Sequence, residues 1–305
     1  MTMRREERTT PVNGAPGRGR PLAPVPAVLL GMVSVQGGAA VAKDLFPALG
    51  ALGTAAARIT LSALVLLAAF RPPLARFGRA HWRAVIPYGL VLGAMNSIFY
   101  LALERIPLGL AVTLEFVGPL AVAVLGSRRP SDLLWVLLAA AGIALLLPWN
   151  AAQVSGLDPL GAVLALVAGG CWAAYILLGG RVSRHFTDGH AVATGMLFAM
   201  LLVLPFAVVD GVLGRLTPPL LGAGLGVALL SSAVPYTLEM VALRELPSRT
   251  FGILMSLEPA IAALAGLLFL SERLAALQWL AVALVSAASA GAALTATGTP
   301  PPLEA

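Results

Sequence analysis

Residues 107–126 read PLGLAVTLEFVGPLAVAVLG, and this stretch decides how the chain folds. It is twenty residues long, and Glu115 is its single charged side chain. An α-helix of about 20 apolar residues is long enough to cross the hydrocarbon core of a bilayer. We therefore expect residues 107–126 to span a membrane, with a carboxylate and the pair Gly118-Pro119 inside the span.

The composition of the whole chain agrees with this interpretation. Of the 305 residues, 59% are hydrophobic and only 11% are charged, and the mean hydropathy is +0.90. Soluble proteins average about 25% charged residues, so this chain has too few charges to cover a globule in water. The net charge of +6 is spread over many short loops, which argues against a nucleic-acid-binding surface. A single cysteine, Cys171, excludes a disulfide framework and a cysteine-rich metal site.

Ten apolar runs of similar length follow one another along the chain. Strands of a membrane barrel would be about half as long and would alternate in polarity, so we expect helices and an all-α polytopic membrane protein. Residues 1–25 and 297–305 lie outside these runs, and the arginine-rich first segment is expected to be a disordered tail. The predicted helices are 26–46, 51–70, 84–103, 107–126, 131–149, 159–179, 189–209, 219–241, 249–270 and 274–296.

The arginines predict the direction in which the helices cross. With the amino terminus inside the cell, fifteen arginines fall in the first tail and the cytoplasmic loops. Only Arg105, Arg215 and Arg273 fall in loops on the opposite face. Cytoplasmic loops of membrane proteins carry an excess of Lys and Arg, so we expect both termini in the cytoplasm.

The two halves of the sequence resemble each other when one is shifted by 140 residues. Pro107 then aligns with Pro247 and Pro119 with Pro259. Each half, 26–149 and 159–296, holds five predicted helices. Because five is odd, the second half must enter the membrane upside down relative to the first. Inverted repeats of this kind are a transporter architecture, with the substrate held between the halves near the middle of the membrane.

A matched pair of interrupted helices predicts where the substrate site lies. One carries Glu115 and Gly118-Pro119, and the other carries Glu258-Pro259. Proline removes a helix hydrogen bond and frees a carbonyl, which is tolerated only inside protein or beside water. We expect both carboxylates to face a wet cavity. The alternative is that the prolines only bend the helices and the glutamates pair structurally.

Further polar and aromatic residues share helix faces at spacings of three, four or seven. They could line the cavity, although the same residue types also tie membrane helices together. Lys43 could instead reach the outer interface, and we expect Arg58 to form a structural ion pair with a neighbouring carboxylate. The candidate substrate-binding residues are Gln36, Lys43, Asn96, Tyr100, Glu115, Trp172, Tyr175, Tyr236 and Glu258.

The sequence contains no nucleotide-binding loop, no metalloprotease motif and no nucleophile matched with a base. We therefore expect no enzyme activity, no cofactor and no metal. Energy for transport would come from an ion or substrate gradient, and Glu115 or Glu258 could carry the proton. Two small-residue pairs, Gly89–Gly93 and Gly222–Gly226, are more typical of packing within the chain than of a dimer face, so the oligomeric state stays open.

Several stretches resemble the drug/metabolite transporter superfamily, of the EamA type, and within it the branch that exports threonine and homoserine. They are 34–39 (SVQGGA), 42–47 (AKDLFP), 114–122 (LEFVGPLAV), 127–130 (SRRP), 235–240 (PYTLEM) and 249–260 (RTFGILMSLEPA). The arginine-rich tail before residue 25 departs from the pattern. The resemblance implies proton-driven export of small amino acids across the bacterial cytoplasmic (inner) membrane. It also implies a cavity lined by the first, third, fourth, sixth, eighth and ninth predicted helices.

Three other functions compete with amino-acid export. A mostly apolar cavity would favour the efflux of drugs or other metabolites. An intramembrane hydrolase would need a nucleophile and a base at the same depth, which the sequence does not offer. A membrane scaffold without transport would not need two broken helices that both carry a carboxylate.

Overall fold

The computed structural model of the chain describes residues 24–125, 132–146, 158–186, 189–235, 238, 246 and 248–295. These residues form helices joined by turns, with no β-strand among them. The helices of the first half are α1 (Pro24–Asp44), α2 (Phe46–Phe70), the short η1 (Leu74–Arg76), α3 (Arg79–Leu103), α4 (Leu108–Glu115), α5 (Val117–Leu125) and α6 (Asp132–Leu146). Those of the second half are α7 (Pro159–Val182), α8 (His190–Val209), α9 (Val212–Arg215), α10 (Pro218–Ala228), the π-helix η2 (Leu229–Ala233), α12 (Ser248–Met255), α13 (Glu258–Phe269) and α14 (Ala276–Thr295).

The predicted all-helical membrane fold is confirmed. Eight helical stretches of the described chain are long and apolar enough to cross a bilayer, counting α4 with α5 and α12 with α13. Two shorter apolar helices, Leu133–Leu146 and Pro218–Ser232, overlap the other two predicted spans, 131–149 and 219–241. Ten crossings in two inverted halves stay a prediction.

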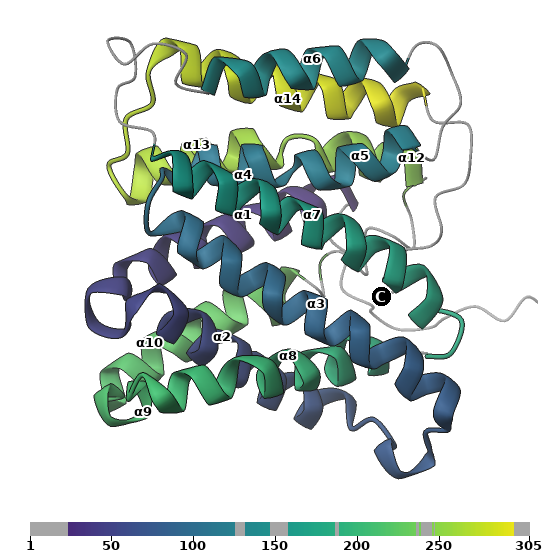
Figure 1. Ribbon diagram of the computed structural model, residues 1–305, viewed down its shortest axis with the longest axis vertical. Coiled ribbons are helices and arrows are strands. Elements are labelled where there is room, and N and C mark those ends of the chain that lie inside the picture. The colour runs from purple at the N-terminus through teal and green to yellow at the C-terminus, as the bar shows by residue number, and fades with distance from the viewer. Residues whose placement is uncertain are drawn as a thin grey trace, which may run out of the picture.

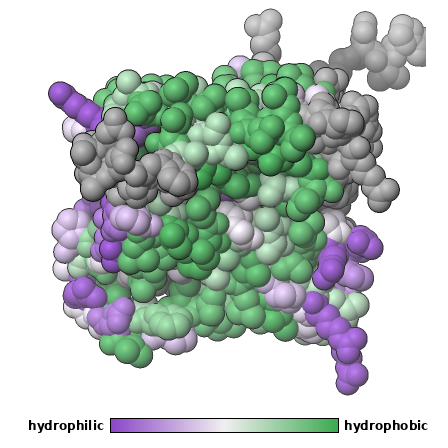
Figure 2. All heavy atoms as spheres, turned by 45° about the horizontal axis from the view of Figure 1, so that its top comes forward, coloured by the Kyte–Doolittle hydropathy of each residue, from purple (hydrophilic) through white to green (hydrophobic). Residues whose placement is uncertain are grey.

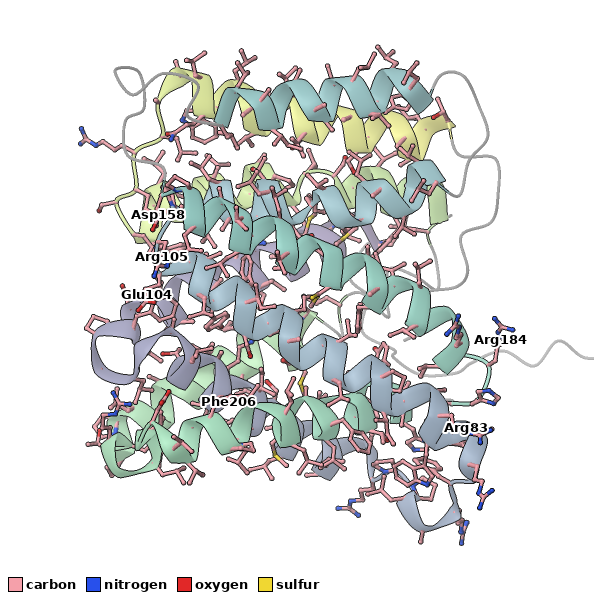
Figure 3. The ribbon with its side chains drawn as sticks, in the orientation of Figure 1. Arg83, Glu104, Arg105, Asp158, Arg184 and Phe206 are labelled. Atoms are coloured by element: carbon pink, nitrogen blue, oxygen red, sulfur yellow. The ribbon has the colours of Figure 1, made fainter. Side chains whose placement is uncertain are left out.

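The helices lie side by side, and most of their ends gather at two opposite edges of the molecule (Figure 1). The pair α6 and α14 lies at the top of this view, α2, α8, α9 and α10 lie at the bottom, and α3 crosses the middle. Figure 3 shows Glu104, Arg105 and Asp158 at one edge and Arg83 and Arg184 at the other. We call these the Arg105 edge and the Arg184 edge.

Apolar side chains cover the surface between the two edges. Figure 2 shows a mainly hydrophobic face with hydrophilic side chains gathered towards its sides. Leu177, Phe206 and Leu268 are 63%, 60% and 73% exposed. Lipid tails solvate large apolar side chains that water would not, so this surface is that of a protein embedded in a bilayer.

Small residues bring the helices of the bundle close together. A Cβ atom at Gly89 of α3 would overlap the carbonyl oxygen of Gly195 on α8, and one at Gly93 would lie 2.9 Å from the Cα of Ala199. Such contacts are typical of helix packing in membranes. The prediction that Gly89–Gly93 packs within the chain is confirmed. At Gly222 and Gly226, no described atom lies within 4 Å of an added Cβ.

The start of α7 is fixed by Asp158, which lies outside the span. Its Oδ2 accepts a hydrogen bond from Arg105 Nη1 at 2.9 Å, and its Oδ1 accepts one from the Leu160 N–H at 2.9 Å. The bond from Arg105, and to a smaller extent the bond from the Leu160 N–H, lower the pKa of the Asp158 carboxyl. The carboxylate is therefore fully charged at neutral pH, and its stabilising effect is lost only as the pH falls below its ordinary value towards the lowered one.

Candidate functional site

The helix that contains Glu115 is broken beside that residue. Pro119 has no N–H, so the carbonyl of Glu115, four residues earlier, loses its usual helical partner. α4 ends at Glu115 and α5 begins at Val117. α7 passes close to the break, since a Cβ atom at Gly169 would lie 2.5 Å from the Glu115 carbonyl oxygen. The break places the carboxylate inside the protein, and Glu115 is only 7% exposed.

A second break lies in the other half of the chain. α12 ends at Met255, and α13 begins at Glu258 with Pro259 in its first turn, where a missing N–H costs no helical bond. Glu258 is also 7% exposed. Its Oε1 accepts a hydrogen bond from Gln36 Nε2 of α1 at 3.3 Å. Each predicted interruption therefore leads to a buried carboxylate.

Both carboxylates line one cavity of about 150 Å³ between the helices. Gln36 lies eight residues before the end of α1, or about 12 Å of helix rise from the Arg105 edge. The cavity is therefore well inside the apolar belt. Its lining residues are Val35, Gln36, Ala39, Arg58, Met95, Asn96, Phe99, Tyr100, Val112, Glu115, Trp172, Ser231 and Glu258.

Arg58 of α2 brings a positive charge to this cavity. Its Nη1 donates to Asn96 Oδ1 at 2.8 Å and makes a longer contact of 3.5 Å with the Tyr100 hydroxyl, both on α3. The Arg58 guanidinium also lies 5.6 Å from the centre of the Tyr100 ring. Within the described chain, no carboxylate is in ion-pair contact with Arg58, so the expected structural ion pair is not seen there. Neutral oxygens one turn apart on α3 hold the guanidinium instead.

Lys43 is placed apart from the cavity, near the Arg105 edge. Its Nζ forms an ion pair with Glu272 Oε1 at 2.6 Å and donates to the Ile106 carbonyl at 3.0 Å. Glu272 Oε2 accepts from the Leu108 N–H at 2.8 Å. This cross-link joins α1, the start of α4 and the turn after α13. Sequence reasoning missed Glu272, because a single carboxylate in a short loop carries no signal of its partner.

The three aromatic candidates other than Tyr100 are placed differently from one another. Trp172 lines the cavity, and its ring packs edge-on against Phe116 at 5.5 Å between centroids. The Tyr175 hydroxyl instead accepts a hydrogen bond from Tyr88 at 2.8 Å, with the two rings stacked, and Tyr175 is not among the lining residues. Tyr236 lies outside the described residues.

A π-helix contributes the remaining polar group, which the sequence reasoning also missed. Ser231 lies in η2 and lines the cavity. The preceding carbonyl, that of Leu230, accepts a hydrogen bond from Ser34 Oγ of α1 at 2.7 Å. Single π-turns inside helices often occur at functional sites. The only signal in the sequence was the pair Ser231-Ser232 in an apolar run.

A larger hollow of about 330 Å³ lies at the Arg105 edge, beside Gly50, Glu104, Asp210 and Arg215. It opens on the surface and gathers residues of loops and helix ends. The smaller cavity is the better candidate site, because its charged groups converge from broken helices inside the span. Broken helices that meet at a charged cavity in an all-helical membrane fold are the design of a membrane transporter.

The chain belongs to the EamA-like transporter family, whose model matches residues 159–294. The threonine/homoserine exporters RhtA of Escherichia coli (strain K12) and Salmonella typhimurium (strain LT2) are each 47% identical to it over 272 residues, covering 89% of this chain and 92% of theirs. The uncharacterized transporter YwfM of Bacillus subtilis (strain 168) is 26% identical over 212 residues, covering 67% of this chain and 71% of its own. The protein is therefore a multi-pass membrane transporter and not an enzyme.

A protein of known crystal structure has the same fold. It matches with a TM-score of 0.53 and 21% identity, covering 89% of this chain and 97% of its own. At this identity the likeness concerns the fold alone.

Proposed function

We propose that the protein exports small amino acids of the threonine and homoserine type across the bacterial cytoplasmic membrane. The observation that carries this proposal is the small cavity, which holds Arg58 together with the carboxylates Glu115 and Glu258. An amino acid is a zwitterion and needs groups of both signs. The 47% identity to two exporters named for threonine and homoserine supports the same substrate class.

The small size of the cavity and the charged groups that it contains argue against drug efflux. Pockets for drug-sized ligands measure about 300–1,000 Å³ and have few polar groups. This cavity measures about 150 Å³ and contains three ionisable side chains. A scaffold is disfavoured by the same groups, because ionisable side chains inside a membrane span are costly and serve transport or proton transfer as a rule.

We infer that two five-helix repeats, 26–149 and 159–296, cross the membrane in opposite directions and give ten spans. The packing partners support this pairing. In chain order, α1, α2 and α3 of the first half correspond to α7, α8 and α10 of the second. α3 packs against α7 and α8, and α10 packs against α1 and α2. α5 and α13, which each follow a break, show the same exchange: α5 packs on α7, and α13 packs on α1. The exchange of partners is what a two-fold axis in the membrane plane requires.

The two edges differ in charge, which supports cytoplasmic termini. The loops and helix ends at the Arg184 edge, residues 71–83 and 181–186, contain six arginines and no acidic residue. At the Arg105 edge, Arg105 pairs with Asp158 and Lys43 with Glu272. The more positive edge is expected to face the cytoplasm, and with it the tails 1–25 and 297–305.

Alternating access follows from these placements as part of the proposal. The cross-link of Lys43, Glu272 and Leu108 lies between the cavity and the outer surface. It would hold the outer end closed, so that the cavity fills from the cytoplasm. Outward opening would then separate α1 from the turn after α13.

Labelled threonine and homoserine in proteoliposomes test the proposal. Wild-type protein is expected to release both substrates faster than empty vesicles. Glu115→Gln and Glu258→Gln are each expected to slow release by about 10- to 100-fold, because a charged hydrogen-bond acceptor is lost. Glu104→Gln is the matched control, since Glu104 is exposed and lines only the larger hollow. Wild-type release no faster than from empty vesicles would refute the substrate class.

Proton coupling through Glu115 or Glu258 is tested separately with a pH gradient. A charged side chain at the centre of a span costs about 2.5–3.5 kcal/mol on insertion scales, and a bound proton removes that charge. The glutamine variant of the coupling residue is expected to exchange labelled for unlabelled substrate at its own reduced rate, and that rate is expected not to respond to an imposed pH gradient. A full response to the gradient in both variants would exclude these carboxylates as proton carriers.

A further inference from the structure

We propose that Arg58 binds the α-carboxylate of the substrate through the edge of its guanidinium formed by Nε and Nη2. This assignment rests on the proposed amino-acid substrate and replaces the structural role that the sequence indicated for Arg58. The substrate ammonium then faces the opposite charge of Glu115 and Glu258.

The orientation of the guanidinium is fixed from one side. Nη1 donates to Asn96 Oδ1 at 2.8 Å, and the Tyr100 hydroxyl lies 3.5 Å away. Asn96 is itself held, because its Nδ2 donates to the Leu92 carbonyl at 2.8 Å. Tyr100 is 1% exposed and cannot swing away. Two side chains of α3 therefore determine which edge of Arg58 remains for a ligand.

The remaining edge has no partner in the described part of the chain. The Nε atom is buried and makes no hydrogen bond there, and the bonds of Arg58 to described residues all come from Nη1. An unmade hydrogen bond at a buried N–H is unfavourable. Nε and Nη2 present parallel N–H groups at the spacing of two carboxylate oxygens, which is the geometry of bidentate recognition.

The charge of Arg58 needs a counter-ion as well. Within the described chain, the two hydrogen-bond partners of the guanidinium are neutral, and the two ion pairs lie elsewhere, at the Arg105 edge. Glu115 lies near enough for its charge to interact with Arg58 but makes no ion-pair contact with it. A cation inside a membrane span normally pairs with an acid or faces a wet cavity. Arg58 lines the cavity, so a carboxylate that enters would supply the direct ion-pair contact that Glu115 does not make.

The rest of the lining suits the other end of an amino acid. Glu115 and Glu258 border the same cavity, and Gln36 donates to one oxygen of Glu258. An ammonium carries three N–H donors and is attracted to such a wall. A ligand that has only one of the two charges would leave one wall unmatched.

Binding of threonine and of threoninol, in which a CH₂OH group replaces the carboxylate, tests the assignment. The dissociation constants are measured on purified full-length protein in detergent, for the wild type, Arg58→Lys and Arg58→Met. The wild type is expected to bind threonine about 10- to 100-fold more tightly than threoninol. Arg58→Met is expected to bind threonine and threoninol equally weakly. Arg58→Lys keeps the positive charge but not the two parallel N–H groups, so its ratio of the two dissociation constants is expected to be intermediate.

A purely structural role of Arg58 predicts a different result. The variants would then lose thermal stability but keep the wild-type preference for threonine, and that outcome overturns the assignment. If Arg58→Met does not fold, the comparison of Arg58→Lys with the wild type decides, and an unchanged ratio again overturns it. A wild type that binds threonine and threoninol equally excludes carboxylate recognition altogether. A wild type that binds and transports neither threonine nor homoserine refutes the proposed function itself.

Discussion

Glu272→Gln is expected to lower the free energy of unfolding by about 3–5 kcal/mol, the usual cost of removing one partner from a buried ion pair. The side chains of Lys43 and Glu272 are 22% and 14% exposed, so the lower end of this range is the better expectation. Glutamine keeps the shape of the side chain and can still accept from the Leu108 N–H. Lys43 keeps its charge, however, with only the Ile106 carbonyl as its other acceptor in the described chain.

The measurement is unfolding of the detergent-purified protein by heat and by denaturant. Arg105→Gln is the matched control, because it removes the other ion pair at the same edge, whose side chains are 40% and 34% exposed. Exposed pairs contribute little, so this variant should unfold like the wild type. The double variant Lys43→Met, Glu272→Met leaves no unpaired charge and should recover most of the lost stability. Equal effects of Glu272→Gln and Arg105→Gln would show that the Lys43 cross-link is not a buried pair.

The helices and their interruptions could be predicted from the sequence because lipid allows few alternatives. A backbone in hydrocarbon must satisfy its own hydrogen bonds, so each long apolar run becomes a helix. Pro119 marks a break for the same reason, since it removes one bond, and Pro259 marks the start of a new helix, where a missing N–H costs none. The predicted start of the second helix at 51 coincides with a kink at Gly50, whose φ is 72°. The residues on the amino-terminal side of the kink are also helical, and α2 therefore begins at Phe46 rather than at residue 51.

The rotation of each helix about its axis could not be predicted in the same way. Trp172 and Tyr175 are three residues apart, which leaves them about 60° apart around the helix. That angle is enough for Trp172 to reach the cavity while Tyr175 pairs with Tyr88 on α3. Arg58 faced the same uncertainty, because its partners Asn96 and Tyr100 are fixed by how α2 lies against α3. Side-chain spacing gives a face, and packing decides which neighbour that face meets.

Partners far apart in sequence form the other group that could not be predicted. Lys43 and Glu272 are separated by 229 residues, and Gln36 and Glu258 by 222. The aligned prolines predict two breaks at matching depth, but they do not indicate which loop residue reaches α1. These contacts depend on how the two halves pack together, which no local pattern records.

Gly169→Ala is expected to destabilise the protein by about 1–3 kcal/mol, because it adds a methyl group to a fully packed contact. The new Cβ would lie 2.5 Å from the carbonyl oxygen of Glu115, and this neighbour is backbone that cannot turn aside. α7 would have to move away from the break between α4 and α5. Since the same movement displaces the carboxylate of Glu115, we expect threonine efflux to fall together with stability.

The neighbouring glycine provides a matched control for this substitution. Gly170 lies in the same helix, and no described atom lies within 4 Å of a Cβ placed on it. Gly170→Ala removes one glycine from α7 and gains helix propensity of up to about 1 kcal/mol, so it should be neutral or stabilising. The two variants differ only in which neighbour the methyl group meets. If Gly169→Ala unfolds like Gly170→Ala and exports threonine at the wild-type rate, then α7 does not press on the Glu115 carbonyl, and the break is held open by something other than this contact.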